Sequence, residues 1–247
     1  MKITFLGSSH GVPSAERYCS CTMIEVNGSL YFIDCGAPLI DILLRRGAPL
    51  GSIRAVFTTH MHGDHVNGLA PLADLCNWYF KDTGFDIYLT EEAGLSLFPQ
   101  MIEAVEGMAL DTQRIRFRLM TPDTLYDDGN IRVTPLPNSH LHYAGRPSYS
   151  YLVEAEGKRV VLTGDMSQGL RQGDFPACTL EAGVDLVISE MAHFGISDAE
   201  PYLKRCKAAR VLFNHVFPLD KLPLIDALDG RFGYPIGTVA DGDEITL

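Results

Sequence analysis

Four potential metal ligands fall within six consecutive residues and constrain the fold more than any other feature of this sequence. They are His60, His62, Asp64 and His65. Imidazole and carboxylate groups suit zinc, iron or manganese. The apolar run at residues 53–57 predicts a buried strand before them, and the apolar spacing at residues 66–75 predicts a helix after them. The ligands are therefore expected on a loop at the carboxyl end of a strand, where α/β folds place their chemistry.

The spacing within this run predicts two metal positions. His60 and His62 can turn toward one point, while the adjacent Asp64 and His65 diverge to a second point. Gly63 permits the tight path between the two pairs. Two ligand pairs on one short loop predict two ions roughly 3.5–4 Å apart, as in hydrolytic two-metal sites. The alternative is a histidine-rich surface loop that binds no metal.

The pattern His-x-His-x-Asp-His resembles the signature of the metallo-β-lactamase superfamily, and the resemblance spans nearly the whole chain. The family brings its remaining ligands from later strand ends. Matching residues occur in the same order here: His140, Asp165 and His215, each after an expected strand. The resemblance implies an α/β fold, a four-layer αβ/βα sandwich, with residues 1–247 as one domain.

The same resemblance implies how the ligands are shared between the two metals. The first metal would be held by three histidines, the second by Asp64 and two histidines, and Asp165 would bridge them. The two sets are His60, His62 and His140 for the first metal, and Asp64, His65 and His215 for the second. His142 is an alternative to His140 for one ligand position of the first metal. If His140 is the ligand, His142 would lie near the site and touch substrate.

Other residues near this motif are candidates for contacts with the substrate. Arg146 could grip a phosphate or carboxylate, because its planar guanidinium matches those anions, or it could be an ordinary surface arginine. His10 could face the substrate or be a plain loop residue.

The N-terminal part resembles the RNase Z branch of the superfamily and the related cyclic phosphodiesterases of phosphonate breakdown. The matching features are the loop at residues 7–13, the Cys19-Ser20-Cys21 run, and a strand leading into Asp34. In the family an aspartate at the position of Asp34 supports the histidine loop from behind, and such groups orient metal ligands. Cys19 and Cys21 are either part of a separate zinc site or two reduced thiols.

Two features depart from the RNase Z pattern. The interval between His140 and Asp165 has room for two strands and a turn, but not for the tRNA-clamping arm that RNase Z enzymes insert there. The formal net charge is −11, and phosphate binding needs clustered Lys and Arg. Both observations argue against tRNA as a substrate and favour a small molecule.

Another difference from the RNase Z pattern lies at the expected strand of residues 184–190. RNase Z enzymes have a His-Glu pair at its end, with the histidine as proton donor, and here the pair is Ser189-Glu190. Glu190 is expected to support the site from behind the ligands. His193 could replace the missing donor, since a positioned histidine can protonate a leaving oxygen, or it could be a strand-end or helix-cap residue.

Together these observations predict a binuclear metal-dependent hydrolase acting on a small or cyclic phosphodiester through a metal-bridging hydroxide. Two divalent ions would make hydroxide available at neutral pH, with zinc favoured and manganese or iron(II) as alternatives. Asp64 would orient the nucleophile, and His193 would serve as acid. The alternatives are a lactone or thioester hydrolase of the same fold, a mononuclear iron sulfur dioxygenase, and a catalytically silent binding protein.

The remainder of the sequence sets broader expectations. The first strand begins without a signal peptide, and no apolar run is long enough to span a bilayer, so a cytoplasmic protein without membrane contact is expected. It could form a homo-oligomer. A helix is expected at residues 198–209, capped by Ser197 or Asp198, and a short closing hairpin or turn at residues 238–247.

Overall fold

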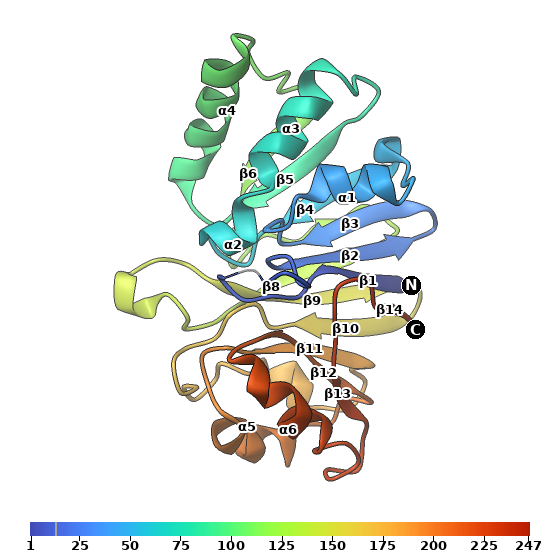
Figure 1. The fold of residues 1–247 in the computed structure, drawn as a ribbon, viewed down its shortest axis with the longest axis vertical. Coiled ribbons are helices and arrows are strands. Elements are labelled where there is room, and N and C mark those ends of the chain that lie inside the picture. Colours follow the sequence, from blue (N-terminus) through green and yellow to red (C-terminus); the bar gives the residue numbers. More distant parts are fainter. Residues whose placement is uncertain (13) are drawn as a thin grey trace.

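Two β-sheets stacked face to face form the centre of the protein, and helices cover the outer surface of each sheet (Figure 1). The computed structural model describes residues 1–12 and 14–247, so Pro13, at the end of the first expected loop, lies outside the described residues. Within the described part, each sheet has seven strands. This helix–sheet–sheet–helix arrangement confirms the predicted four-layer αβ/βα sandwich.

The first sheet has the strand order β14-β1-β2-β3-β4-β5-β6. Its strands are β1 (Lys2–Gly7), β2 (Cys21–Val26), β3 (Ser29–Ile33), β4 (Ile53–Phe57), β5 (Phe85–Leu89), β6 (Ile115–Leu119) and β14 (Glu244–Thr246). From β3 to β6 neighbouring strands run parallel, because helical crossovers connect them. These helices are α1 (Leu39–Arg45), α2 (Gly63–Val66), α3 (Leu69–Trp78) and α4 (Glu92–Glu106), with the 3-10 turn η1 (Leu50–Ser52) before β4.

The second sheet has the order β13-β12-β11-β10-β9-β8-β7. Its strands are β7 (Tyr126–Asp127), β8 (Arg132–Pro137), β9 (Tyr149–Ala155), β10 (Lys158–Leu162), β11 (Leu186–Met191), β12 (Val211–Val216) and β13 (Ile236–Thr238). Strands β7 to β10 are antiparallel, and β10 to β13 are parallel. The helical segments are η2 (His142–Ala144), η3 (Ala177–Leu180), α5 (Ile196–Leu203), η4 (Leu219–Lys221) and α6 (Leu222–Asp226).

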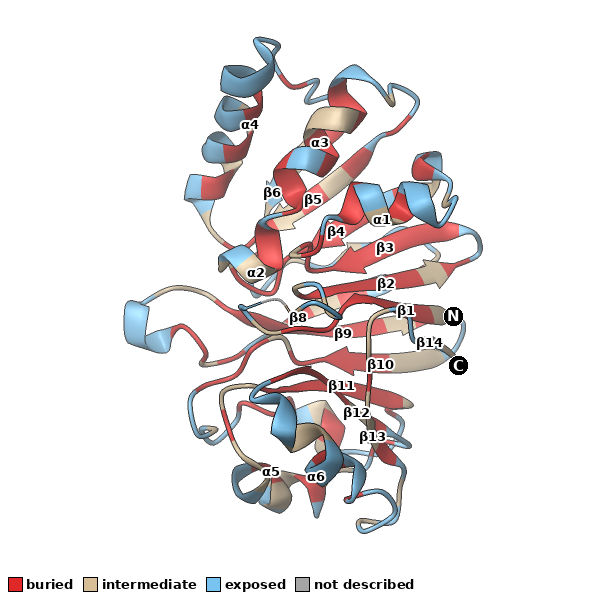
Figure 2. Ribbon diagram, viewed as in Figure 1, coloured by how far each residue is buried: buried red, intermediate tan, exposed pale blue. Residues whose placement is uncertain are grey.

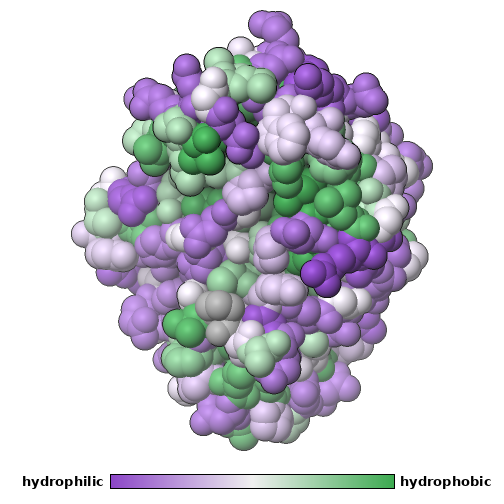
Figure 3. Space-filling model, turned by 45° about the horizontal axis from the view of Figure 1, so that its top comes forward, coloured by the Kyte–Doolittle hydropathy of each residue, from purple (hydrophilic) through white to green (hydrophobic). Residues whose placement is uncertain are grey.

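Buried side chains fill the spaces between the four layers (Figure 2). Between the sheets, for example, the ring of Phe57 in β4 lies 6.0 Å from that of Tyr151 in β9. Strands with both faces covered read as continuous apolar runs, which is why β4 could be predicted from sequence. Apolar side chains also reach the surface on α4, including Leu97, Met101 and Val105. Figure 3 shows green patches toward the top of the view, where the helices of the first sheet lie.

Three expected elements differ from the structure. The helix after the metal loop is divided into α2 and α3. Helix α5 begins after Gly195, whose backbone N–H donates to the Asp198 carboxylate at 2.8 Å, so the predicted caps Ser197 and Asp198 lie inside the helix. It ends at Leu203, and the first backbone N–H beyond it that bonds outside the helix is that of Lys207, which donates to the carbonyl of Thr179 at 2.8 Å.

Of the two expectations for residues 238–247, the closing hairpin is wrong and the turn is confirmed, since Asp243 N–H donates to the carbonyl of Ala240 at 3.1 Å. Strand β13 pairs with β12 in the second sheet, whereas β14 pairs with β1 in the first sheet. The tail therefore joins the two sheets rather than folding on itself. Among the described residues, the structure contains no helix with the length and apolar character needed to cross a membrane.

Candidate metal centre

The carboxyl ends of strands from both sheets converge at one edge of the sandwich, beside α2 (Figure 1). The loop after β4 carries His60 and His62, helix α2 carries Asp64 and His65, and the residue after β3 is Asp34. The second sheet contributes His140 after β8, Asp165 after β10, and His215 within β12. All seven predicted ligands therefore lie at one edge of the fold, although the first, His60, and the last, His215, are far apart in the sequence.

Four of the predicted ligands form cluster 1: His60, His62, His140 and Asp165. One potential ligand atom from each lies within 4.8 Å of those of the others. The Nε2 atoms of His60 and His140 each lie 3.8 Å from Oδ2 of Asp165. His142 is exposed on η2 and is outside this cluster, so the geometry favours His140 over His142.

The other ligands form cluster 2: Asp64, His65, His215 and Asp165. Nε2 of His215 lies 3.1 Å from Oδ1 of Asp165, and Nε2 of His65 lies 3.5 Å from the same oxygen. Nε2 of His65 is also 3.3 Å from Oδ2 of Asp64. Asp165 therefore turns one carboxylate oxygen to each cluster, which is the arrangement required of a bridging ligand.

Several polar atoms in these clusters are buried without a hydrogen-bond partner among the described residues. They are Nε2 of His60, His65 and His140, and Oδ1 of Asp165. An unsatisfied buried polar group costs roughly 1–3 kcal/mol. Divalent cations would satisfy these atoms together, and the imidazole and carboxylate donors suit such ions. The residues present therefore fit a pair of divalent metals.

Hydrogen bonds on the far side of the His60, His65 and His140 rings hold these three ligands in place. Nδ1 of His140 is 3.0 Å from the carbonyl of Met166, and Nδ1 of His65 is 2.7 Å from Oδ2 of Asp34. Each Nδ1 carries the proton because its partner can only accept, which leaves Nε2 free to bind an ion. Nδ1 of His60 lies 3.0 Å from the Thr59 hydroxyl.

Asp34 fixes the histidine loop from behind, as expected from the sequence. Its backbone is left-handed, with φ of 62°, at the end of β3. Oδ1 accepts hydrogen bonds from the backbone N–H of Thr59 at 2.7 Å and from its hydroxyl at 3.1 Å. Together with the contact to His65, these bonds tie the loop after β4 to the end of β3.

Burial and charge set the protonation states of the ligands. Burial lowers the pKa of His60, and repulsion from His65 adds to this effect, so His60 is neutral and able to bind metal. For Asp165 burial would raise the pKa, but His215 and His65 outweigh it and lower the pKa, so the carboxylate is ionised. Both residues are therefore in the protonation state that metal binding requires. For His65 and His215 burial would lower the pKa, but the nearby carboxylates, Asp34 and Asp165 for His65 and Asp165 for His215, outweigh it and raise the pKa, so these two rings would release a proton when an ion binds.

His193 and Glu190 lie beside cluster 1. Nδ1 of His193 is 3.0 Å from both Glu190 carboxylate oxygens and 3.8 Å from Oδ2 of Asp165. The His193 ring packs against that of His140 at 4.7 Å. Glu190 also accepts the backbone N–H of Met166 at 2.7 Å, so it holds the segment after Asp165 as well as His193.

The remaining sequence candidates have different surroundings. Arg146 is paired with Glu91 at the start of α4, at 2.6 Å from Nη2 to Oε1, so its guanidinium already has an anionic partner. The His10 ring lies 6.4 Å from that of His215 and 3.8 Å from that of Phe217. His10 is therefore close to cluster 2, while Arg146 links two loops.

Sequence reasoning missed two supporting residues, Asp174 and Phe217. The buried Asp174 accepts hydrogen bonds from the Ser139 and Ser167 hydroxyls, and so joins the segment before His140 to the one after Asp165. Nothing local marks Asp174, since its partners are distant in sequence. Phe217 could have been noticed as an aromatic residue directly after the last ligand strand.

Comparison with known proteins identifies related families. Residues 1–189 match the model of a family described as anti-Pycsar protein Apyc1. The chain is 32% identical over 142 residues to ribonuclease Z from Picosynechococcus sp., which covers 57% of this chain and 44% of the relative. It is 29% identical over 167 residues to ribonuclease Z from Shouchella clausii, covering 64% and 49%. The chain thus spans about half the length of these curated relatives.

Solved structures share the fold over the full length. The metallo-β-lactamase fold protein YhfI from Bacillus subtilis has a TM-score of 0.77 at 21% identity, covering 99% of this chain and 98% of its own. The short form of human tRNase Z has a TM-score of 0.73 at 21% identity, covering 100% and 99%. These similarities confirm the predicted metallo-β-lactamase fold and the resemblance to RNase Z.

The expectation that tRNA is not a substrate is contradicted by these findings. Relatives named ribonuclease Z match 57% and 64% of the chain, and a tRNase Z shares the fold over its full length. The expectation relied on a missing arm between His140 and Asp165 and on a net charge of −11. Net charge is a sum over the whole molecule, so it does not describe the surface around the site. The missing arm does not exclude an RNA substrate either, because another surface can hold the RNA.

Proposed function

The chain belongs to the anti-Pycsar protein Apyc1 family, and from this membership and the geometry of the two clusters we propose that it is a binuclear metal-dependent phosphodiesterase. One observation carries the proposal: the two oxygens of Asp165 face two separate groups of buried ligands. A single carboxylate between two such groups suits a pair of cations, as in enzymes that stabilise both the attacking and the leaving oxygen of a displacement.

The ions, zinc by our proposal, would supply Lewis-acid polarisation of a phosphoryl oxygen and a nucleophile available at neutral pH. The chain's own residues would orient the reactants. Asp64, a member of cluster 2 at 3.3 Å from Nε2 of His65, would accept a hydrogen bond from the nucleophile. Because Nδ1 of His193 donates to Glu190, its Nε2 is the atom that can deliver a proton to the leaving oxygen.

We propose a small or cyclic phosphodiester as substrate, and an RNA 3′ region as a second candidate. The resemblance of the N-terminal part to cyclic phosphodiesterases supports the first. The relatives named ribonuclease Z support the second. Lactone or thioester hydrolysis remains the alternative within the same fold. A mononuclear dioxygenase would use one iron and leave the ligands of cluster 2 without a role.

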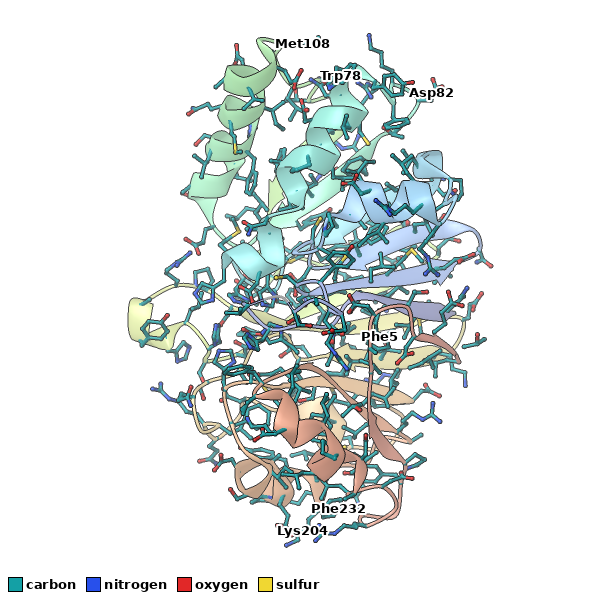
Figure 4. All side chains as sticks on the ribbon, in the orientation of Figure 1. Phe5, Trp78, Asp82, Met108, Lys204 and Phe232 are labelled. Carbon is teal, nitrogen blue, oxygen red and sulfur yellow. The ribbon has the colours of Figure 1, made fainter. Side chains whose placement is uncertain are left out.

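The test is an assay panel with the metal-loaded protein. It contains 3′,5′-cyclic nucleotides, bis(p-nitrophenyl) phosphate, a tRNA precursor with a 3′ trailer, a lactone and a thioester. We expect turnover of phosphodiesters, and its loss by at least a hundredfold in Asp165→Asn, since the shared ligand is weakened for both ions. Asp82→Asn is the matched control, because Asp82 is exposed in the turn before β5 and remote from the clusters (Figure 4). Turnover confined to the lactone or thioester would contradict the proposal.

A further inference from the structure

An exposed aromatic side chain stands next to cluster 2. Phe217 follows the ligand His215 by two residues, and 47% of its surface is exposed. A single exposed phenylalanine is ordinary on a protein surface. Phe217 differs because its ring contacts that of His10, close to the ligand His215, and because the proposed reaction gives it no role.

His10 is the ring that braces Phe217. The two ring centroids are 3.8 Å apart with planes at 74°, an edge-to-face contact. Nδ1 of His10 accepts a hydrogen bond from the backbone N–H of Val12 at 2.9 Å, which fixes the orientation of the imidazole. His10 is also in edge-to-face orientation to His215, with centroids 6.4 Å apart.

The two loops that carry these rings are tied together. The backbone N–H of His215 donates to the carbonyl of Ser8 at 3.1 Å. The Ser8 hydroxyl and N–H both donate to Asp241, at 2.6 and 2.8 Å, so the first loop is anchored at a second point. These backbone contacts around His215 position the rings of His10 and Phe217, which lie side by side near cluster 2.

We propose that Phe217, in contact with His10, is a positioning residue that stacks against a planar aromatic or heteroaromatic ring carried by the esterified group of the substrate. This inference rests on the proposed phosphodiesterase function and specifies which phosphodiesters the site prefers. The His10 ring lies 6.4 Å from that of His215 and 3.8 Å from that of Phe217, so a substrate group that leaves the clusters past His215 would meet this pair of rings. Stacking on an aromatic side chain is tolerant of the identity of the ring, so it selects for planarity.

The test compares two cyclic phosphodiesters with the same six-membered ring. A 3′,5′-cyclic nucleotide carries a base, and 1,3-cyclic glycerol phosphate carries none. For Phe217→Leu we expect KM for the nucleotide to rise about tenfold with kcat nearly unchanged, while both constants for the base-free substrate stay as in the native protein. Phe217→Trp should restore the low KM, because it restores a flat ring.

The matched control is Tyr79→Leu. Tyr79 is another exposed aromatic residue, 64% exposed, adjacent to Trp78 at the end of α3 that lies far from the site (Figure 4). It should change neither substrate's constants. Equal effects of Phe217→Leu on both substrates, or no effect on either, would overturn the inference.

Binding separates this inference from the proposed function. Calorimetry with a 3′,5′-cyclic nucleoside phosphorothioate, which resists hydrolysis, measures stacking without turnover. If the native protein hydrolyses no phosphodiester of the panel, the phosphodiesterase proposal fails, whereas a tenfold weaker phosphorothioate affinity in Phe217→Leu still supports the stacking role of Phe217. An unchanged affinity of Phe217→Leu for the phosphorothioate would rule out the stacking role of Phe217.

Discussion

Opposing effects act on the imidazole of His193. Burial lowers its pKa, but the hydrogen bond and charge of Glu190 outweigh burial and raise the pKa to about 9. A raised pKa means that the protonated form is present at neutral pH and is lost as the pH rises through the folded value. If His193 donates a proton to the leaving oxygen, activity should therefore fall on the alkaline side of the profile.

The variant Glu190→Gln tests this assignment. It removes the negative charge but keeps a side chain of the same shape, so the pKa of His193 should fall. We expect the alkaline limb of the pH profile of kcat/KM to move to lower pH, by about one unit or more. His193→Gln should remove that limb and reduce kcat. An alkaline limb that stays in place in Glu190→Gln, with metal content unchanged, would show that His193 is not the acid.

Single residues differ in how well the sequence reveals them. His60, His62, Asp64 and His65 are recognisable because the ligands share one short loop, where spacing alone limits the geometry. Asp174 acts by joining the loops that carry Ser139 and Ser167, which meet only in the folded protein. The spacing of residues in the sequence does not predict this contact. For the same reason the partner of Arg146 could not be foreseen, since Glu91 is 55 positions away in the chain.

Among the elements, strands buried on both faces are the most predictable. The run at β4 is apolar at four of its five positions, and the only exposed residue is Arg54. Elements whose ends depend on distant partners are less predictable. After helix α5 the backbone N–H of Lys207 donates to the carbonyl of Thr179, and β14 pairs with β1 rather than with its neighbour in sequence, β13. Helical spacing and turn residues carry no information about either contact.

The segment between β3 and α1 packs directly on α2, and a glycine makes this possible. A Cβ atom on Gly36 would lie 1.6 Å from the backbone oxygen of Asp64. The neighbouring backbone is also joined, since Cys35 N–H donates to the carbonyl of His65 at 2.7 Å. No L side chain fits at position 36 without displacing the turn that carries two ligands of cluster 2.

We therefore expect Gly36→Ala to lower the free energy of unfolding by about 1–3 kcal/mol, the usual cost of overpacking. It should also weaken metal binding at cluster 2, because Asp64 and His65 move together. Gly51→Ala is the control, since its nearest contact would be 3.9 Å from the new methyl group. Urea unfolding and metal content measure both effects. A Gly36→Ala protein with native stability and two bound ions would contradict the packing argument.

In the whole molecule, the two clusters join the halves of the sandwich. The loop after β4 belongs to the first sheet, whereas His140, Asp165 and His215 come from the second. The sequence could indicate the ligand types but not this geometry, because the convergence of strand ends is a property of the completed fold. Ions bound at both clusters would connect the two sheets at the edge where His60, His65, His140 and Asp165 have buried polar atoms without a hydrogen-bond partner among the described residues.

Metal removal should consequently lower the stability of the entire protein. A ligand that binds only the folded state stabilises it by about 2.7 kcal/mol at a hundred times its Kd. For a protein of this size, 1 kcal/mol corresponds to roughly 2–4 °C in Tm. We expect zinc to raise the Tm of the chelator-treated protein by about 5–10 °C in a concentration-dependent manner. The shift should be largely lost in Asp165→Asn and retained in Asp82→Asn. If Tm does not depend on zinc, then the buried nitrogens are satisfied in another way, and the clusters do not link the two sheets through ions.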